Sequence, residues 1–243
     1  VLLRTSASFQ TFSGTITAVN NEGIAVGLQS QLNSNLGYID AAANIDLTCA
    51  IGAGIVLNHI DNPGVASAFM GPLAGKIKIT SNGVLGDNSV VAGIFTNVDN
   101  GSTPTGTIAT TVDLVNGAQI IAVQQLDSEL AFVAGNNNAG LITIRGQSAT
   151  DNFKMVGGLV GAGGTLIENG VYNWSNLHTV ESGRALAIGF ISTEVTNITI
   201  ASTATVILED NAVFKESVVD VAGKLVLTAD TVDSFSSVTL DRG

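Results

Sequence analysis

Short stretches of alternating apolar and polar residues follow one another through residues 195–240, separated only by polar or glycine breaks such as Asp210-Asn211 and Ala222-Gly223. An alternation with a period of two indicates a β-strand with one buried face. This feature constrains the fold most, because it places strand directly after strand with no helix between them. It predicts strands at 197–200, 204–208, 212–214, 217–221, 224–228 and 236–240.

These strands also repeat. Apolar positions recur after about 20 residues, as in the pairs Ile198 and Val218, Val206 and Leu225, and Val219 and Val238. Three short strands in each repeat would form one turn of a parallel β-helix, in which every strand pairs with its equivalent in the next turn. The predicted fold is therefore all-β, a parallel β-helix (β-solenoid) with irregular loops.

The first half of the chain has the same texture at wider intervals, with predicted strands at 13–19, 76–80, 89–96, 106–114, 119–123 and 140–145. Long loops leaving a solenoid would give this spacing, and so would an antiparallel β-sandwich followed by a short solenoid. We predict the solenoid and keep the sandwich as the alternative. The chain is expected to form a single β-rich domain, 1–243, with an irregular region at 1–150 and a more regular one at 151–243.

Two segments have a helical spacing of apolar residues. Leucines at 28, 32 and 36 lie four positions apart, and a second one-sided stripe consists of Val123, Leu126, Leu130 and Val133. Each predicts a short capping or packing helix.

Composition excludes several classes of partner. A hydrophobic content of 45% with 12% charged residues indicates a folded chain rather than a disordered one. The net charge of −11 and the lack of a Lys/Arg cluster argue against nucleic acid. The longest apolar run, 49–57, is broken by Gly52 and Gly54, so no membrane insertion is expected. The lone Cys49 lies in this run and is expected to be a buried small hydrophobic residue.

Catalytic and metal-binding patterns are missing from the sequence. His59 and His178 do not form a metal-spaced pair, and each is expected in a loop or at the surface. The glycine-rich stretch 157–164 has no Gly-Lys-Ser/Thr ending and predicts a tight turn or close backbone packing. We therefore expect no enzyme, with no catalytic residues, no cofactor and no metal. A polysaccharide-degrading β-helix enzyme is the least favoured alternative, and its paired acids would be Asp127/Glu129 or Glu209/Asp210.

Large polar-tipped aromatic residues concentrate in one place, where Tyr172, Trp174 and His178 lie close together, with Arg184 beyond them. Such residues are favoured in carbohydrate sites and at protein interfaces. These four residues are the candidate recognition or interface patch. The competing interpretation is that Trp174 fills the core or a subunit contact.

The runs 204–214 (ATVILEDNAVF) and 219–227 (VDVAGKLVL) resemble the passenger repeats of autotransporter adhesins and related β-helical bacterial surface proteins. The resemblance implies a right-handed β-helix displayed outside the cell for adhesion, or as a component of a layer or fibre. It does not extend to a translocating barrel, which these residues lack. The chain begins at Val1, which fits a cleaved signal peptide or a piece of a longer protein.

The predicted function is an extracellular or cell-surface structural or adhesive protein, forming a stiff β-rich scaffold. Its expected partners are copies of itself, in a homo-oligomer or larger assembly, and a host surface glycan or protein. The alternative is a virion fibre, spike or capsid-associated protein.

Overall fold

The computed structural model describes residues 2–3, 11–30, 38–60, 67–81, 90–99, 108–124, 129–134, 139–160, 164–175, 197–209, 217–227 and 235–240. All the regular elements in these ranges are β-strands, which confirms the all-β class. The same ranges contain no helix long and apolar enough to cross a membrane.

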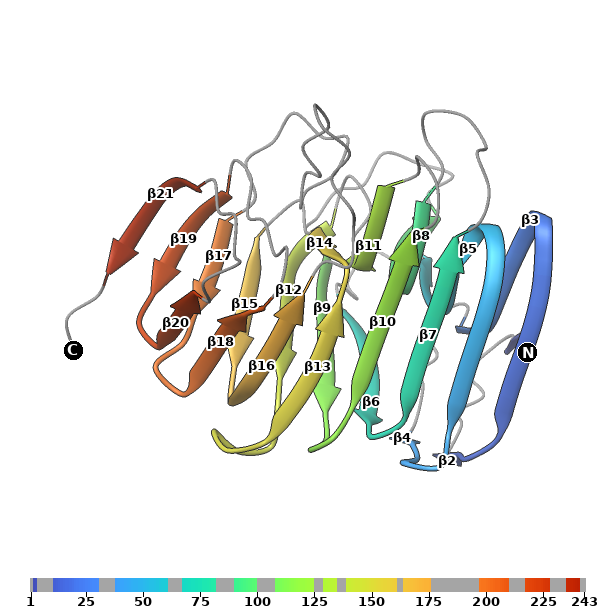
Figure 1. Cartoon of the computed structure of the whole chain (residues 1–243), viewed down its shortest axis with the longest axis horizontal. Coiled ribbons are helices and arrows are strands. Elements are labelled where there is room, and N and C mark those ends of the chain that lie inside the picture. Colours follow the sequence, from blue (N-terminus) through green and yellow to red (C-terminus); the bar gives the residue numbers. More distant parts are fainter. Residues whose placement is uncertain are drawn as a thin grey trace.

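The strands form two sheets (Figure 1). Sheet A has 12 strands: β1 (Leu2–Leu3), β3 (Thr15–Ser30), β5 (Asn44–Ile60), β7 (Lys76–Ser81), β8 (Val90–Asp99), β10 (Gln119–Gln124), β11 (Glu129–Ala134), β13 (Asn152–Val156), β14 (Gly158–Val160), β16 (Gly170–Ser175), β18 (Ala204–Leu208) and β20 (Lys224–Leu227). Sheet B has nine: β2 (Thr11–Phe12), β4 (Tyr38–Ile39), β6 (Ser67–Leu73), β9 (Ile108–Leu114), β12 (Ala139–Arg145), β15 (Thr165–Glu168), β17 (Asn197–Ile200), β19 (Ser217–Val221) and β21 (Phe235–Leu240).

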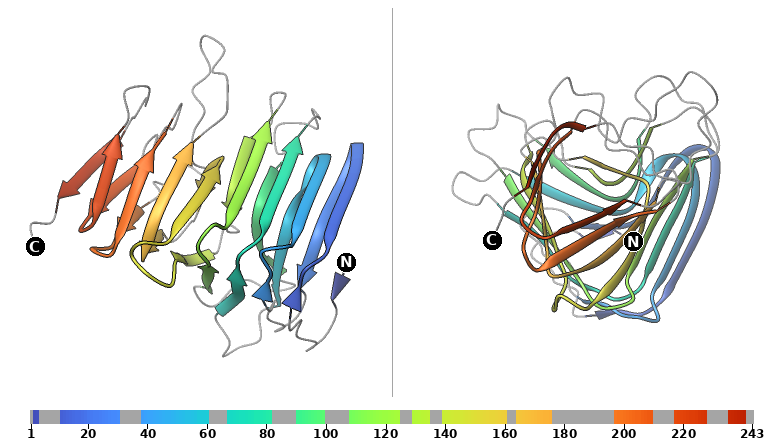
Figure 2. Two further views of the ribbon diagram at one scale, coloured as in Figure 1. Left: turned by 60° about the horizontal axis from the view of Figure 1, so that its bottom comes forward. Right: turned by 60° about the vertical axis from the view of Figure 1, so that its left-hand side comes forward.

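The described strand pairs are all parallel, and the chain returns repeatedly to each sheet. Sheet A branches at β5, whose first half pairs with β7 and whose second half pairs with β8, which continues to β11 and β14. Each strand pairs with its counterpart from a later visit, as when Ile45 lies beside Ile77 and Ile77 beside Ile120. The strands therefore stack in sequence order along the long axis of the molecule, as Figures 1 and 2 show. Parallel pairing in both halves overturns the antiparallel sandwich considered for the first half.

Inward-facing side chains make one continuous core between the sheets. Burial alternates along the strands, as expected when successive side chains point to opposite faces. Because neighbouring strands are in register, the buried residues line up in columns that run from strand to strand along the stack. Sheet A contributes Ile45, Ile77, Ile120, Met155, Trp174 and Leu208, and sheet B contributes Ile144, Ile167, Ile200 and Val221, all at most 5% exposed. Burying one such aliphatic side chain contributes about 1.5–3 kcal/mol.

Tight turns join sheet B to sheet A, and they stack on one another as the strands do. The Lys76 amide donates to the Ala43 carbonyl of the preceding turn at 3.0 Å, and the Gln119 amide to the Gly75 carbonyl at 3.2 Å. A side chain at Gly75 would place Cβ 2.6 Å from the Ala43 carbonyl oxygen. Glycine is required there because one backbone passes so close to the next.

The predicted strands of the last fifth are confirmed at 197–200, 204–208 and 217–221, and within one residue at 224–228 and 236–240. The stretch 212–214 lies outside the described residues. Two predicted repeat pairs are confirmed in the register, Val206 with Leu225 and Val219 with Val238. The third is off by one position, because Ile198 pairs with Val219.

Both helix predictions are wrong in the described residues. Leu28 lies in β3, where it pairs with Ile55. Val123 lies in β10, where it pairs with Thr80, and Leu130 and Val133 belong to β11. In the second stripe, the helix-like spacing arises because the apolar positions of β10 and β11 are read across the connection between them. Leu32, Leu36 and Leu126 lie outside the described residues.

Cys49 is a buried core residue, as predicted, with no exposed surface. Burial raises the pKa of its thiol, since the charged form would lose its hydration.

Candidate functional site

Tyr172 and Trp174 lie two positions apart on β16 and point into the core, where both are 0% exposed. The predicted recognition or interface patch is therefore wrong for these two residues, whose rings are not presented at the surface. The competing interpretation, in which Trp174 fills the core, holds instead. His178 and Arg184 lie outside the described residues.

Both polar tips are satisfied by backbone carbonyls, as buried donors require. The Tyr172 hydroxyl donates to the Glu168 carbonyl at 2.6 Å, and the carbonyls of Ile144 and Asn169 lie at 3.3 and 3.4 Å. The Trp174 indole Nε1 donates to the Gly157 carbonyl at 2.9 Å. Gly157, at φ +117°, also donates its amide to the Ser175 carbonyl, which confirms close backbone packing for this part of the glycine-rich stretch.

Phe153 of β13 packs against Tyr172, with ring centroids 5.0 Å apart at an angle of 40°. Two glycines make room for it. A Cβ on Gly146 would lie 2.7 Å from the Phe153 ring, and one on Gly170 would lie 2.4 Å from it. This aromatic pair is a packed core feature, and Tyr172 is its only polar member.

Burial also raises the pKa of Tyr172, because ionisation would place a charge in the core; the neighbouring Glu168 and Asp151 carboxylates act in the same direction. The hydroxyl therefore stays protonated and remains a hydrogen-bond donor. It is a structural donor rather than an acid or base in solution.

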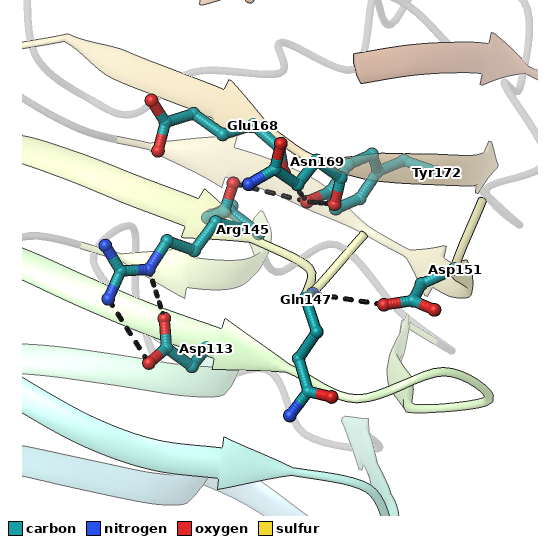
Figure 3. A network of polar contacts seen from close by, with 8 residues as sticks. Asp113, Arg145, Gln147, Asp151, Glu168, Asn169 and Tyr172 are labelled. Carbon is teal, nitrogen blue, oxygen red and sulfur yellow. Dashed lines mark hydrogen bonds and ion pairs between the residues drawn. The ribbon is translucent and has the colours of Figure 1, made fainter. Parts of the chain in front are cut away.

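A polar network lies on strands β9, β12 and β15 of sheet B and on the turn after β12, beside Tyr172 (Figure 3). Arg145 at the end of β12 is the register partner of Asp113 on β9 and of Glu168 on β15. Its Nε donates to Asp113 Oδ1 at 2.5 Å, and its Nη2 faces Oδ2 at 3.4 Å. The hydrogen bond to Asp113 raises the pKa of Arg145, which stays charged.

The turn after β12 is closed by a carboxylate. Asp151 Oδ2 accepts hydrogen bonds from the backbone amides of Gln147 and Ser148 at 3.0 and 2.9 Å. In the same region Asn116 Oδ1 accepts from the Asn152 amide at 2.8 Å, which ties one turn to the next. The carboxylates of this network thus hold backbone and side-chain donors in place.

The acids considered for an enzyme are only partly described. Glu129 begins β11 and Glu209 follows β18, whereas Asp127 and Asp210 lie outside the described residues. His59, expected in a loop or at the surface, belongs to strand β5, where it pairs with Val98. Within the described ranges, no three His, Cys, Asp or Glu residues gather in a group suited to a metal ion.

Comparison with protein-family models, with curated proteins and with solved structures found no match for this chain.

Sequence reasoning missed the Phe153–Tyr172 pair and the Asp113–Arg145 pair, since the partners lie 19 and 32 positions apart. One signal was present in the sequence. Tyr172 and Trp174 alternate with Val171 and Asn173, and this alternation places both aromatic rings on one face of a strand.

Proposed function

We propose that the chain is a β-solenoid that serves as a stiff structural scaffold displayed outside the cell. The observation that carries the proposal is the parallel in-register ladder. From β3 to β20, each strand of sheet A pairs with its counterpart, and sheet B does the same from β2 to β21. A stack held by backbone hydrogen bonds along its whole length and filled by buried columns resists bending and local opening.

Display at a surface is supported by the resemblance of 204–227 to autotransporter passenger repeats. It is also supported by the varying length of chain between paired strands. Paired positions are separated by 19 residues between Val206 and Leu225 but by 43 between Lys76 and Gln119. Long connections leave the ladder intact, and they are where proteins carry recognition elements.

Self-assembly is supported by the two ends of the stack. The large apolar side chains exposed in the described residues belong to the strands at these ends, Val19, Ile24 and Val26 in β3 and Leu227 in β20. Edge strands with exposed apolar side chains favour pairing with a further strand. We infer that copies of the chain, or flanking segments of a longer chain, cover these ends.

The scaffold is tested by a matched pair of substitutions on β12. Ile144 points inward and is 0% exposed, whereas its neighbour Thr143 is half-buried on the outer face. Ile144→Asp should abolish the β circular dichroism signal and the resistance to trypsin, because it buries an unpaired charge. Thr143→Asp should keep both, and small-angle X-ray scattering should show the same elongated particle as for the wild type. A compact particle, or equal effects of the two substitutions, would exclude the solenoid.

Display outside the cell needs a separate test in the source organism. Antibodies against the purified protein should label intact cells, and added protease should remove that labelling. Labelling that appears only after lysis would overturn the surface assignment while leaving the scaffold untouched.

A further inference from the structure

A column of polar side chains runs across the outer face of sheet A. Register pairing places Asn44, Lys76, Gln119, Lys154 and Asn173 on five neighbouring strands, β5, β7, β10, β13 and β16. Each of these residues is flanked by buried positions and is itself exposed or half-buried, so all five lie on the outer face. We refer to these five residues as the polar column.

The polar column lies in a basic part of an acidic protein. Among the strands β7, β10, β13, β16, β18 and β20 there is no Asp or Glu, although the chain has 20 acidic and only 9 basic residues. The same strands carry Lys76, Lys78, Lys154 and Lys224. The nearest acid on the first half of β5, Asp46, is the register partner of Lys78 and faces its Nζ at 3.9 Å.

Sheet B has the opposite character. Asp113, Glu168 and Asp220 lie on its strands, and Arg145 is the single basic residue described there. Sheet A also carries Glu22 on β3, Asp99 on β8 and Glu129 on β11, but these acids lie outside the strands that carry the four lysines. Fields between exposed charges are screened beyond about 8 Å at physiological ionic strength, so the lysines of sheet A attract anions despite the net charge of the whole chain.

The spacing of the polar column selects a kind of partner. Neighbouring strands are about 4.8 Å apart, so the ammonium groups of Lys76 and Lys154 stand on strands about 10 Å apart, with the Gln119 amide between them. A regular row of cations and amide donors matches a linear polymer that carries carboxylates and hydroxyls at regular intervals. Extended polysaccharides made of uronic acids have this chemistry, and their sugar residues advance by a length similar to one strand spacing.

We propose that the polar column binds a carboxylated polysaccharide that lies along the stack, with Lys76 and Lys154 pairing with carboxylates and the three amides bonding to hydroxyls. Charge complementarity carries this proposal. This binding goes beyond the scaffold role. It rests on the proposed function in one respect, because display outside the cell would bring the polar column into contact with such a polymer.

The experiment uses the purified chain, so its outcome does not depend on where the protein is displayed. Polygalacturonate is the probe and neutral dextran its control, with binding followed by affinity electrophoresis and calorimetry at physiological ionic strength, where the distant acids are screened. The double substitution Lys76→Gln with Lys154→Gln should weaken polygalacturonate binding roughly tenfold, since two exposed ion pairs are lost. Gln119→Glu should weaken it further, because a carboxylate then stands in the middle of the column.

Lys224→Gln is the matched control, because Lys224 is an exposed lysine of the same sheet that lies outside the polar column. Its affinity for polygalacturonate should be unchanged, and circular dichroism should show that all variants fold. An equal loss with Lys224→Gln would mean general attraction to a basic face and would overturn the column. Salt-sensitive self-association in sedimentation, lost in the double variant and without polygalacturonate binding, would assign the column to a second copy and overturn the polysaccharide.

Discussion

The stretch around β17 to β20 and the stretch from β3 to β10 use the same pairing but differ in the length of chain between paired strands. Val206 and Leu225 are 19 positions apart, whereas Asn44 and Lys76 are 32 apart, and Lys76 and Gln119 are 43 apart. In both stretches the strands are parallel and the buried residues continue the same columns. Part of the added length is a further strand, since β8 lies between β7 and β10 in the chain and pairs with the second half of β5. The comparison teaches that the core constrains the strands and tolerates different lengths of chain between them, since a longer loop adds little closure entropy.

The largest effect is expected from a substitution at Trp174. Its strand, β16, lies between the two stretches, because it pairs with β13 on one side and with β18 on the other. Trp174→Ala should lower the free energy of unfolding by about 3–5 kcal/mol, through the cavity and the unpaired Gly157 carbonyl. Urea unfolding followed by circular dichroism measures the loss.

Asn173→Ala is the control, since Asn173 is the outward neighbour and the loss of its long hydrogen bond from Nδ2 to the Phe153 carbonyl, at 3.4 Å, should cost less than about 1 kcal/mol. A single transition shared by both stretches is expected in the wild type. Two separate transitions would show that the stretches on either side of Trp174 fold as independent units.

The turns give a second test, because Gly75 and Gly223 occupy matching positions in the two stretches. A Cβ on Gly223 would lie 2.2 Å from the Ala201 carbonyl oxygen, compared with 2.6 Å for the closest atom at Gly75. Each substitution by alanine should cost about 1–3 kcal/mol, with the larger loss at Gly223, since the backbone must move apart.

Gly14→Ala is the control for these turns, because its Cβ would meet only the Phe12 ring at 3.4 Å. Thermal unfolding of the three variants gives the ranking. An equal loss at Gly14 would show that backbone flexibility, rather than close approach, explains the effect.

The same contrast explains how much of the fold could be predicted. Where connections are short, the repeat was visible, and the pairing of Val206 with Leu225 followed from spacing alone. Where they are long, individual strands such as Lys76–Ser81 were predicted but their partners were not, since no fixed period links them. The helix predicted from Val123 to Val133 failed for this reason, because the sequence does not mark where one strand ends and the next begins.

The surface prediction for Tyr172 and Trp174 failed for a different reason. Composition identified Tyr172 and Trp174 as unusual, but it carries no information on which face of a strand they occupy. Their partners, Phe153 and the Gly157 carbonyl, become visible only once the register of β13 and β16 is known. The polar column was hidden in the same way, because its five residues are spread over 130 positions of the sequence.

Tyr172→Phe, also on β16 between the two stretches, should have a smaller effect on stability than Trp174→Ala. Near pH 7 it should cost about 1 kcal/mol, because the hydrogen bond to the Glu168 carbonyl is lost. The folded state raises the pKa of Tyr172 above its ordinary value near 10, so the unfolded chain releases this proton first. The stability of the wild type is therefore complete below about pH 10 and falls as the pH rises further.

The phenylalanine variant lacks this loss, so the difference between the two proteins should shrink or reverse near pH 11. Urea unfolding at both pH values measures it. Tyr38→Phe changes the other tyrosine and controls for general alkaline effects. A constant difference from pH 7 to pH 11 would show that the Tyr172 hydroxyl is not protected by the core.

The smallest effect is expected on the outer faces, where the described residues of each sheet form one ion pair between register partners. Arg145 and Asp113 on sheet B are 43% and 20% exposed and form a direct hydrogen bond, whereas Lys78 and Asp46 on sheet A are 38% and 39% exposed and 3.9 Å apart. Arg145→Gln should cost less than about 1 kcal/mol, and Lys78→Gln should cost less still, because solvent screens both pairs and only the first has a hydrogen bond. Thermal unfolding at low and high salt should show both losses shrinking as salt is added. Equal losses that persist at high salt would contradict this expectation. They would mean that the packing of the long side chains, rather than their charge, stabilises the outer faces of both sheets.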